Sequence, residues 1–305
     1  MSETPIARRV VERMRRQVRA KVADLSAFRA GAARAEELQK TVASPETLKE
    51  LPLGHAMYAH VQNQMSVMAE QLLELAEMKP FVKVIGAAED DYMPSWPPMS
   101  PITTSFFWCW SHLDVSVNAY RETLGSVTMA VAAEFGVHPA MLTMMRTFLD
   151  SRMGVYRVEG YRDSCVKLRD LVTDQPCTAT CTSGYTGEAG ELWFARVLPP
   201  PVSRPDDHVV FTSPYVLLLP DVMGWTQYFD RVASQDSRRS RIEALERDLK
   251  WGPTRRYWPE FLFEGYVNHC PGAIYLKGLP DIAASRPMSP QYKGGAAFSR
   301  SSPST

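Results

Sequence analysis

Apolar residues recur every three or four positions in the first part of the chain, and this spacing predicts amphipathic helices. Residues 5–40 are predicted to form one long helix, with an apolar stripe made of Ile6, Val10, Met14, Val18, Val22, Leu25 and Phe28. Ser44 and Pro45 are typical of a helix start, because serine is a good N-cap and proline suits the first helical position. A stronger helix is predicted from about His55 to Met78.

The pattern changes to alternation of apolar and polar residues between positions 153 and 220, which predicts short strands. Residues 192–197 are a clear case. One face of this segment carries Trp193, Ala195 and Val197, and the other carries Leu192, Phe194 and Arg196. Turn residues separate these segments at intervals of roughly 8–12 residues, as in a small antiparallel sheet or barrel. The glycines at 184, 187 and 190 are predicted to form a hairpin turn, since a phosphate-binding loop would be followed by a helix.

Helices are predicted on both sides of this β module. A helical hairpin precedes it, with one helix over 121–135 and the next starting at Pro139. After it, the spacing of Trp225, Tyr228, Phe229 and Val232 predicts a helix. A capping box at 240–243 then opens another helix, with Ile242, Leu245 and Leu249 expected to face inward. The aromatic segment 106–110 fits a helix and a strand equally well and is expected to be buried or to form an interface.

The predicted fold class is therefore α+β, with an N-terminal helical region, a central small antiparallel β module, and C-terminal helices before a disordered tail. The expected organisation is N-terminal helices in 1–85 with a basic amphipathic first helix, a proline-rich loop in 86–101, an aromatic patch and helical hairpin in 102–152, the β module in 153–220, C-terminal helices in 221–286 and the tail in 287–305.

Charge and cysteine content narrow the classes of function. The chain has 34 basic and 34 acidic residues, so no whole-molecule field steers it to nucleic acid or to an anionic membrane, although local patches remain. Five cysteines without a framework-like spacing indicate reduced thiols, which favours a cytoplasmic location. No apolar run approaches the ~20 residues that span a bilayer, so a soluble protein without a transmembrane segment is expected.

Two basic segments are candidate nucleic-acid interfaces. The first helix is rich in arginine but lacks aromatic residues for base stacking, whereas segment 238–258 interleaves arginines with aromatic rings. The candidate residues are Arg8, Arg9, Arg15, Arg16, Arg19, Arg238, Arg239, Arg241, Arg255, Arg256 and Trp258. The arginines of the first helix also suit an acidic partner or a membrane surface, or a helix docked on the core with a solvated cationic face. For segment 238–258, the alternative is that the aromatic rings belong to the core and the arginines are solvated. These alternatives stay open.

No metal site or other cofactor is predicted. Cys165, Cys177 and Cys181 are the obvious thiol ligands, with His208 downstream. Zinc needs each sulfur ~2.3 Å from one ion. Positions 177 and 181 lie about 13 Å apart on an extended strand, so they cannot share an ion there.

Motifs of catalysis are absent: the chain has no nucleophile elbow, P-loop, kinase signature or HExxH sequence. The leading hypothesis is a non-enzymatic protein-interaction or regulatory protein that acts through its β module and its basic N-terminal helix. A nucleic-acid-binding protein is the first alternative. An enzyme with a site assembled from distant residues is the second, and its candidates are Cys109, His112, Asp114 and His269.

Overall fold

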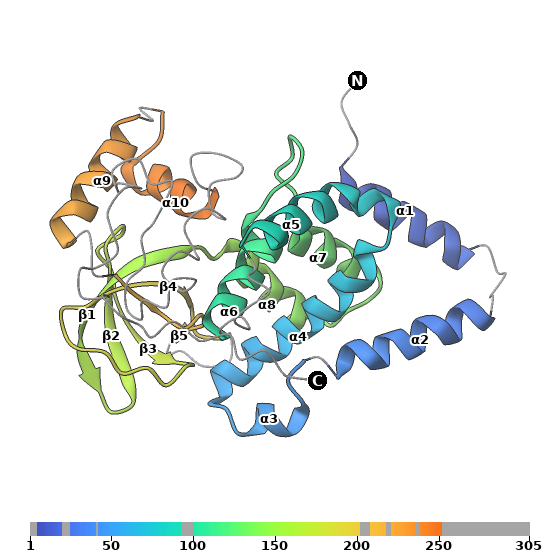
Figure 1. Ribbon diagram of the computed structural model, residues 1–305, viewed down its shortest axis with the longest axis horizontal. Helices are drawn as coiled ribbons and strands as arrows, with labels where there is room; N and C mark the ends of the chain where they lie inside the picture. Colours follow the sequence, from blue (N-terminus) through green and yellow to red (C-terminus); the bar gives the residue numbers. More distant parts are fainter. Residues whose placement is uncertain are drawn as a thin grey trace, which may run out of the picture.

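The computed structural model describes residues 5–19, 25–40, 42–92, 101–201, 208–217, 221–235 and 238–251. Its first part is helical and contains α1 (Ile6–Arg19), α2 (Leu25–Gln39), α3 (Pro45–Lys49), α4 (Leu53–Leu73), the 3₁₀ helix η1 (Ala76–Met78), α5 (Lys79–Tyr92), α6 (Pro101–Cys109), the π-helix η2 (Trp110–Asp114), α7 (Leu124–Glu134) and α8 (Pro139–Asp150). Six strands follow: β1 (Met153–Arg162), β2 (Cys165–Asp170), β3 (Pro176–Cys181), β4 (Leu192–Leu198), β5 (His208–Val210) and β6 (Tyr215–Leu217). Helices α9 (Val222–Gln235) and α10 (Arg241–Trp251) complete the described chain and lie over the strands (Figure 1).

The α+β prediction is confirmed, and several helix ends follow local rules. Ser44 caps α3, where its side chain accepts a hydrogen bond from the Thr47 amide at 3.2 Å. Ser240 and Glu243 form the predicted capping box at the start of α10. Gly136 lies just beyond α7 with φ of +81°, a left-handed conformation that glycine adopts without strain.

The strands form a closed mixed barrel. Their order is β1-β2-β3-β5-β4, and β4 pairs back with β1, while β6 adds to β4 outside this ring. Every pairing is antiparallel except β3 with β5, which are parallel. The prediction of a purely antiparallel module was therefore wrong at one pairing, because β5 lies between β3 and β4 rather than at an edge.

The same strand order corrects the prediction for the glycine-rich segment. Residues 182–191 connect β3 to β4, but these two strands are not paired, because β5 separates them. The segment is thus a connection across one end of the barrel and not a hairpin turn. Gly184 and Gly190 still serve as turn residues there, with φ of +69° and +98°.

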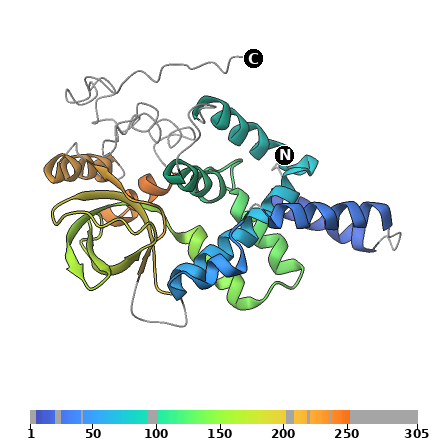
Figure 2. The ribbon, with the colours of Figure 1, turned by 60° about the horizontal axis from the view of Figure 1, so that its bottom comes forward.

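Three predictions about the extent or the buried face of helices were also wrong in part. Residues 5–40 form two helices, α1 and α2, which run in different directions, and residues 20–24 between them lie outside the described residues (Figures 1 and 2). Helix α5 continues to Tyr92, so the first part of the predicted loop 86–101 is helical. Ile242 is 44% exposed, because α10 packs through Ala244, Leu245 and Leu249 instead.

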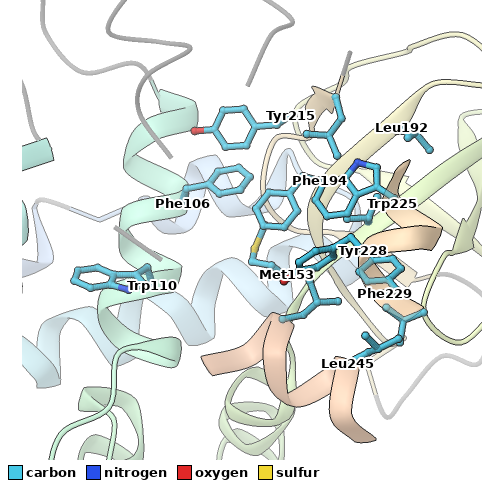
Figure 3. Close-up of a cluster of buried hydrophobic side chains, with 14 of the residues drawn as sticks. Phe106, Trp110, Met153, Leu192, Phe194, Tyr215, Trp225, Tyr228, Phe229 and Leu245 are labelled. Atoms are coloured by element: carbon cyan, nitrogen blue, oxygen red, sulfur yellow. The ribbon is translucent and has the colours of Figure 1, made fainter. Parts of the chain in front are cut away.

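An aromatic core joins the helical part, the barrel and the C-terminal helices. Phe106 of α6 lies 4.0 Å, between ring centroids, from Tyr215 of β6, and Trp110 of η2 belongs to the same cluster. Trp225, Tyr228 and Phe229 of α9 complete it from the opposite side (Figure 3). The aromatic segment 106–110, undecided from sequence, is therefore a helix that is largely buried against the barrel.

Candidate functional site

The π-helix η2 contains two of the residues considered for catalysis, His112 and Asp114. π-helical turns are rare and are frequent at functional sites. All five residues of η2 are buried, including Ser111, His112 and Asp114, and Cys109 directly precedes them. The remaining candidate, His269, lies outside the described residues. The sequence neighbours Cys109, His112 and Asp114 thus share one buried segment.

Asp114 forms what we term the buried ion cluster with Arg196 of β4 and Lys250 of α10. The Arg196 guanidinium donates to Asp114 Oδ2, and Lys250 Nζ lies 3.1 Å from Asp114 Oδ1. Both cations also donate to Ser151 at the end of α8: Arg196 to its Oγ at 2.8 Å and Lys250 to its carbonyl at 2.7 Å. The exposed fractions of Asp114, Arg196 and Lys250 are 4%, 0% and 7%. The cluster therefore links the helical part, the barrel and α10.

The buried ion cluster holds two cations around one carboxylate. Ions are costly to bury unless they are paired and hydrogen-bonded. Burial lowers the pKa of the Lys250 ammonium to about 8, even though the Asp114 carboxylate opposes this change. Burial also raises the pKa of the nearby Cys109 thiol to about 12. Cys109 is consequently a protonated thiol at neutral pH and not an activated nucleophile.

His112 is held in a fixed, uncharged position. Its Nδ1 lies 3.0 Å from Ser111 Oγ and 3.1 Å from the Trp108 carbonyl oxygen. Its ring stacks on the Trp108 indole, with centroids 4.6 Å apart and an interplanar angle of 18°. Burial lowers the pKa of His112 to about 4, so the imidazole is neutral near pH 7. These contacts explain a structural role for His112 and Asp114.

Sequence reasoning missed Arg196 and Lys250. A signal for Arg196 was present, because it shares a strand face with Leu192 and Phe194, both of which are buried. A lone cation on a buried face requires a carboxylate partner. Lys250 follows the inward-facing Leu249 directly and carried no comparable signal, since its burial depends on how α10 docks on the rest of the chain.

A pocket of about 400 Å³ lies between α2 and α4, and α6 contributes to it. Its lining residues are Leu38, Val42, Ala43, Gln62, Asn63, Ser66, Val67, Glu70 and Trp108. Its volume falls within the range of small-molecule sites. The Trp108 indole donates from Nε1 to Ser66 Oγ at 2.7 Å, and Asn63 donates from Nδ2 to the Ala43 carbonyl at 2.9 Å. The pocket reaches Trp108 but is not lined by Ser111 or His112.

Helix α1 docks on the core through its N-terminal half. Ile6 and Val10 are buried, and the helix packs on α7. Ion pairs join Arg8 to Glu12 at 2.9 Å, Arg13 to Glu77 at 2.9 Å and Arg15 to Glu134 at 2.5 Å. Arg9 is partly buried.

The last turn of α1 has a different environment. Residues 15–19 are all exposed, and they include Arg16, Arg19 and Val18, which is 71% exposed. Glu134, the partner of Arg15, directly precedes the exposed Phe135, and the nearby Arg19 adds to the lowering of the Glu134 pKa. Arg16 has no hydrogen bond or ion pair in the part of the chain that the structure describes. We call Arg15, Arg16, Val18, Arg19 and Phe135 the arginine end of α1.

The second basic segment is only partly described. Arg238 and Arg239 are exposed just before α10, and Arg241 pairs with Asp230 at 2.9 Å. Arg255, Arg256 and Trp258 lie outside the described residues. Helix α10 lies over the barrel, whereas α1 belongs to the far side of the helical part (Figure 1). The described arginines of the two segments therefore do not form one continuous surface.

The three cysteines of the barrel lie on two paired strands. Cys165 is on β2 opposite Thr180, whereas Cys177 and Cys181 are both on β3. Among the described residues, no group of three or more histidine, cysteine, aspartate or glutamate side chains is placed to hold a metal ion. None of the described helices is both long and apolar enough to cross a membrane.

No protein-family model, curated protein or solved structure matches the chain.

Proposed function

We propose that this chain is a non-enzymatic protein-interaction or regulatory protein that acts through its basic N-terminal helix and its β barrel. The observation that carries the proposal is the arginine end of α1. The apolar stripe of this helix anchors it through Ile6 and Val10, while residues 15–19 stay exposed, as does Phe135, which follows Glu134, the partner of Arg15. A docked helix whose last turn presents cations and apolar side chains together is a suitable recognition surface.

The chemistry of this surface selects an acidic partner. Arginine binds carboxylates through two parallel hydrogen bonds, as Arg15 already does with Glu134 at 2.5 and 2.6 Å. Arg16 and Arg19 offer the same geometry to a partner, and Val18 with Phe135 adds apolar contact area. Cys109 and His112 are both buried and the Cys109 thiol is protonated, which supports a binding function over nucleophilic catalysis at η2.

The test is site-specific photo-crosslinking of the full chain in its native cells, with p-benzoylphenylalanine in place of Val18. We expect one predominant crosslinked protein with an acidic surface. The double variant Arg16→Glu and Arg19→Glu should remove this crosslink, because each arginine then repels the partner's carboxylates. The double variant Lys40→Glu and Lys49→Glu is the matched control, since it changes the net charge by the same amount at two exposed positions, at the end of α2 and on α3. Equal crosslinking by the arginine double variant and this control would contradict the proposal.

Nucleic-acid binding is a second candidate, favoured by the barrel. Small five-stranded Greek-key barrels bind oligonucleotides on strands 2 and 3. Here Lys167 of β2 is exposed between the inward-facing Val166 and Leu168. Arg157 and Arg169 lie on the same outer face, but both pair with Glu159. This arrangement supplies little free positive charge, which is why the candidate ranks second.

An electrophoretic mobility shift tests this second candidate. If the barrel binds single-stranded DNA or RNA, the shift should weaken steeply with salt, and Lys167→Glu should reduce the affinity and the salt dependence. The single variant Lys49→Glu controls here for net charge. Absence of a shift for the wild-type chain at low salt would remove nucleic acid as a ligand of the barrel and of the arginines on α1.

A further inference from the structure

The pocket between α2 and α4 has a built wall and a fixed floor. Asn63, Ser66, Val67 and Glu70 follow the spacing i, i+3, i+4, i+7, so they share one face of α4 and form the wall. Trp108 supplies the floor from α6. The opposite side comes from Leu38 of α2 and from Val42 and Ala43, which directly precede the Ser44 cap of α3.

Trp108 is rigidly held before any ligand arrives. Its indole is stacked on His112, its Nε1 donates to Ser66, and its ring makes T-shaped contacts with Phe148 and Phe211 at centroid distances of 5.9 and 6.4 Å. A fixed ring loses little conformational entropy on binding. His112 is neutral near pH 7 because burial lowers its pKa to about 4, so it adds no positive charge behind the ring.

Glu70 is the one charged side chain among the described residues that line the pocket, and Gln62, Asn63 and Ser66 are its polar ones. Asn63 uses its amide nitrogen on Ala43, which leaves its Oδ1 as an acceptor. Glu70 is exposed and has no ion pair or hydrogen bond within the described residues. Among the residues that the structure describes, no lysine or arginine lines the pocket. Its formal charge is therefore negative, and its floor is an indole.

We propose that this pocket binds a small organic cation, an ammonium or guanidinium group attached to a flat or short apolar body. An indole attracts a cation through its ring electrons, the Glu70 carboxylate pairs with it, and Asn63 Oδ1 accepts one of its hydrogen bonds. Leu38, Val42 and Val67 contact the apolar body. The site lies apart from the arginine end of α1, so the inference goes beyond the proposed function and stands or falls independently of it.

The experiment is isothermal titration of the full chain with benzylammonium, benzyl alcohol and benzoate, which share a ring and differ in charge. Benzylammonium should bind, while the neutral and the anionic compounds should bind at least about tenfold more weakly, since the charge-assisted contact is lost. Acetyl-arginine-amide forms a further arm and distinguishes a free amine from the side chain of a peptide. Binding of either cation supports the inference. The cation that binds more tightly shows whether the natural ligand is a free amine or the side chain of a peptide.

Two variants assign the binding to this pocket. Glu70→Gln removes the charge at nearly constant size and should weaken benzylammonium about tenfold. Its matched control is Glu36→Gln, an equal charge change at an exposed position of α2 that does not line the pocket. Ala43→Phe fills the rim from an exposed position and should abolish binding.

Three results would overturn the inference: no binding of either cation, equal binding of benzyl alcohol and benzylammonium, or an unchanged affinity in both Glu70→Gln and Ala43→Phe. Circular dichroism of each variant establishes that it is folded. Because Glu70 and Ala43 are both exposed, neither substitution disturbs the core.

Discussion

Arginine meets carboxylate in two contrasting places in this molecule. In the buried ion cluster, Arg196 and Asp114 are 0% and 4% exposed, and Lys250 and Ser151 complete the contacts. At the arginine end of α1, Arg15 and Glu134 form a bidentate pair in solvent. Both pairs look alike as hydrogen bonds. One pair is surrounded by protein and the other by water, and this difference decides how much each pair contributes to the stability of the fold.

Water makes the exposed pair replaceable. An exposed ion pair gains little, because its groups are well solvated when they separate. The buried groups have no such alternative, so removal of one partner leaves a charge without compensation. The buried ion cluster is thus a structural connection between three parts of the chain, whereas the exposed pair of Arg15 and Glu134 can separate into water at little cost. The following predictions test this contrast.

The largest effect is expected from Asp114→Asn. This substitution leaves Arg196 and Lys250 buried without a carboxylate and should lower the free energy of unfolding by about 3–5 kcal/mol. Urea denaturation followed by circular dichroism measures it. Asp150→Asn on the exposed end of α8 is the control and should leave the midpoint unchanged. Equal midpoints for both variants would show that the buried ion cluster does not hold the fold.

A second effect should appear in acid and arise from His112. Its pKa in the folded chain is about 4, below the ordinary value of 6.5. The unfolded chain therefore binds the proton first, and the folded state loses stability as the pH falls from 6.5 to 4. The full difference corresponds to about 3 kcal/mol. His112→Asn keeps a polar group near the Nδ1 position, and its stability should fall less than that of the wild type over this range.

The comparison for His112 is made at pH 7 and pH 4 by urea denaturation of both proteins. Because other groups titrate equally in the two chains, the difference between them isolates the histidine. Parallel loss of stability in the wild type and in His112→Asn would contradict a neutral buried imidazole.

Lys250 should give an effect of similar size on the alkaline side, and with the same sign, because its pKa is lowered like that of His112 and stability therefore again rises with pH. Its pKa in the folded chain is about 8, below its ordinary 10.5. Between these values the unfolded chain keeps the proton that the folded chain has lost, so the wild type should gain up to about 3 kcal/mol as the pH rises through this window. Lys250→Met lacks the titrating group. Its free energy of unfolding, measured from pH 7 to pH 10.5, should not show this gain.

The free energy of unfolding of Lys250→Met at pH 7 can be compared directly with that of Asp114→Asn. Removal of Lys250 leaves Arg196 paired with Asp114, so no buried charge is left alone. We expect a stability close to that of the wild type at pH 7, since a buried ion replaced by an apolar side chain of similar volume is often neutral. A loss as large as that of Asp114→Asn would show that both cations are needed.

The contrast also explains what the sequence could predict. Local signals identified the cap at Ser44, the capping box at Ser240, the start of α8 at Pro139 and the strands of the β module, because these depend on neighbours along the chain. The arginines of α1 were identified from composition alone. What composition could not show is that Arg13 and Arg15 meet glutamates more than 60 positions away.

Long-range contacts account for the remaining errors. The parallel pairing of β3 with β5 has no local signature, since it depends on where β5 enters the barrel. The buried ion cluster depends on residues 82 positions apart, Asp114 and Arg196, and on the docking of α10. The pocket at Trp108 likewise requires α2 to lie along α4. Each of these features depends on packing between distant segments. The periodicity of apolar residues cannot predict this packing, because it indicates only which face of a segment is buried.

The smallest effect is expected at the exposed pair. Glu134→Gln removes the carboxylate that Arg15 holds, and that hydrogen bond is the main cause of the lowered pKa of Glu134. The variant should unfold at the same urea concentration as the wild type within error, because solvent screens both groups. Its binding should change more than its stability, since Arg15 then becomes available to an acidic partner beside Arg16 and Arg19. We therefore expect the crosslink from position 18 to strengthen, and to weaken for both chains as salt is raised. A clear loss of stability in Glu134→Gln would mean that the exposed pair and the buried pair both stabilise the fold, which would contradict the distinction between them.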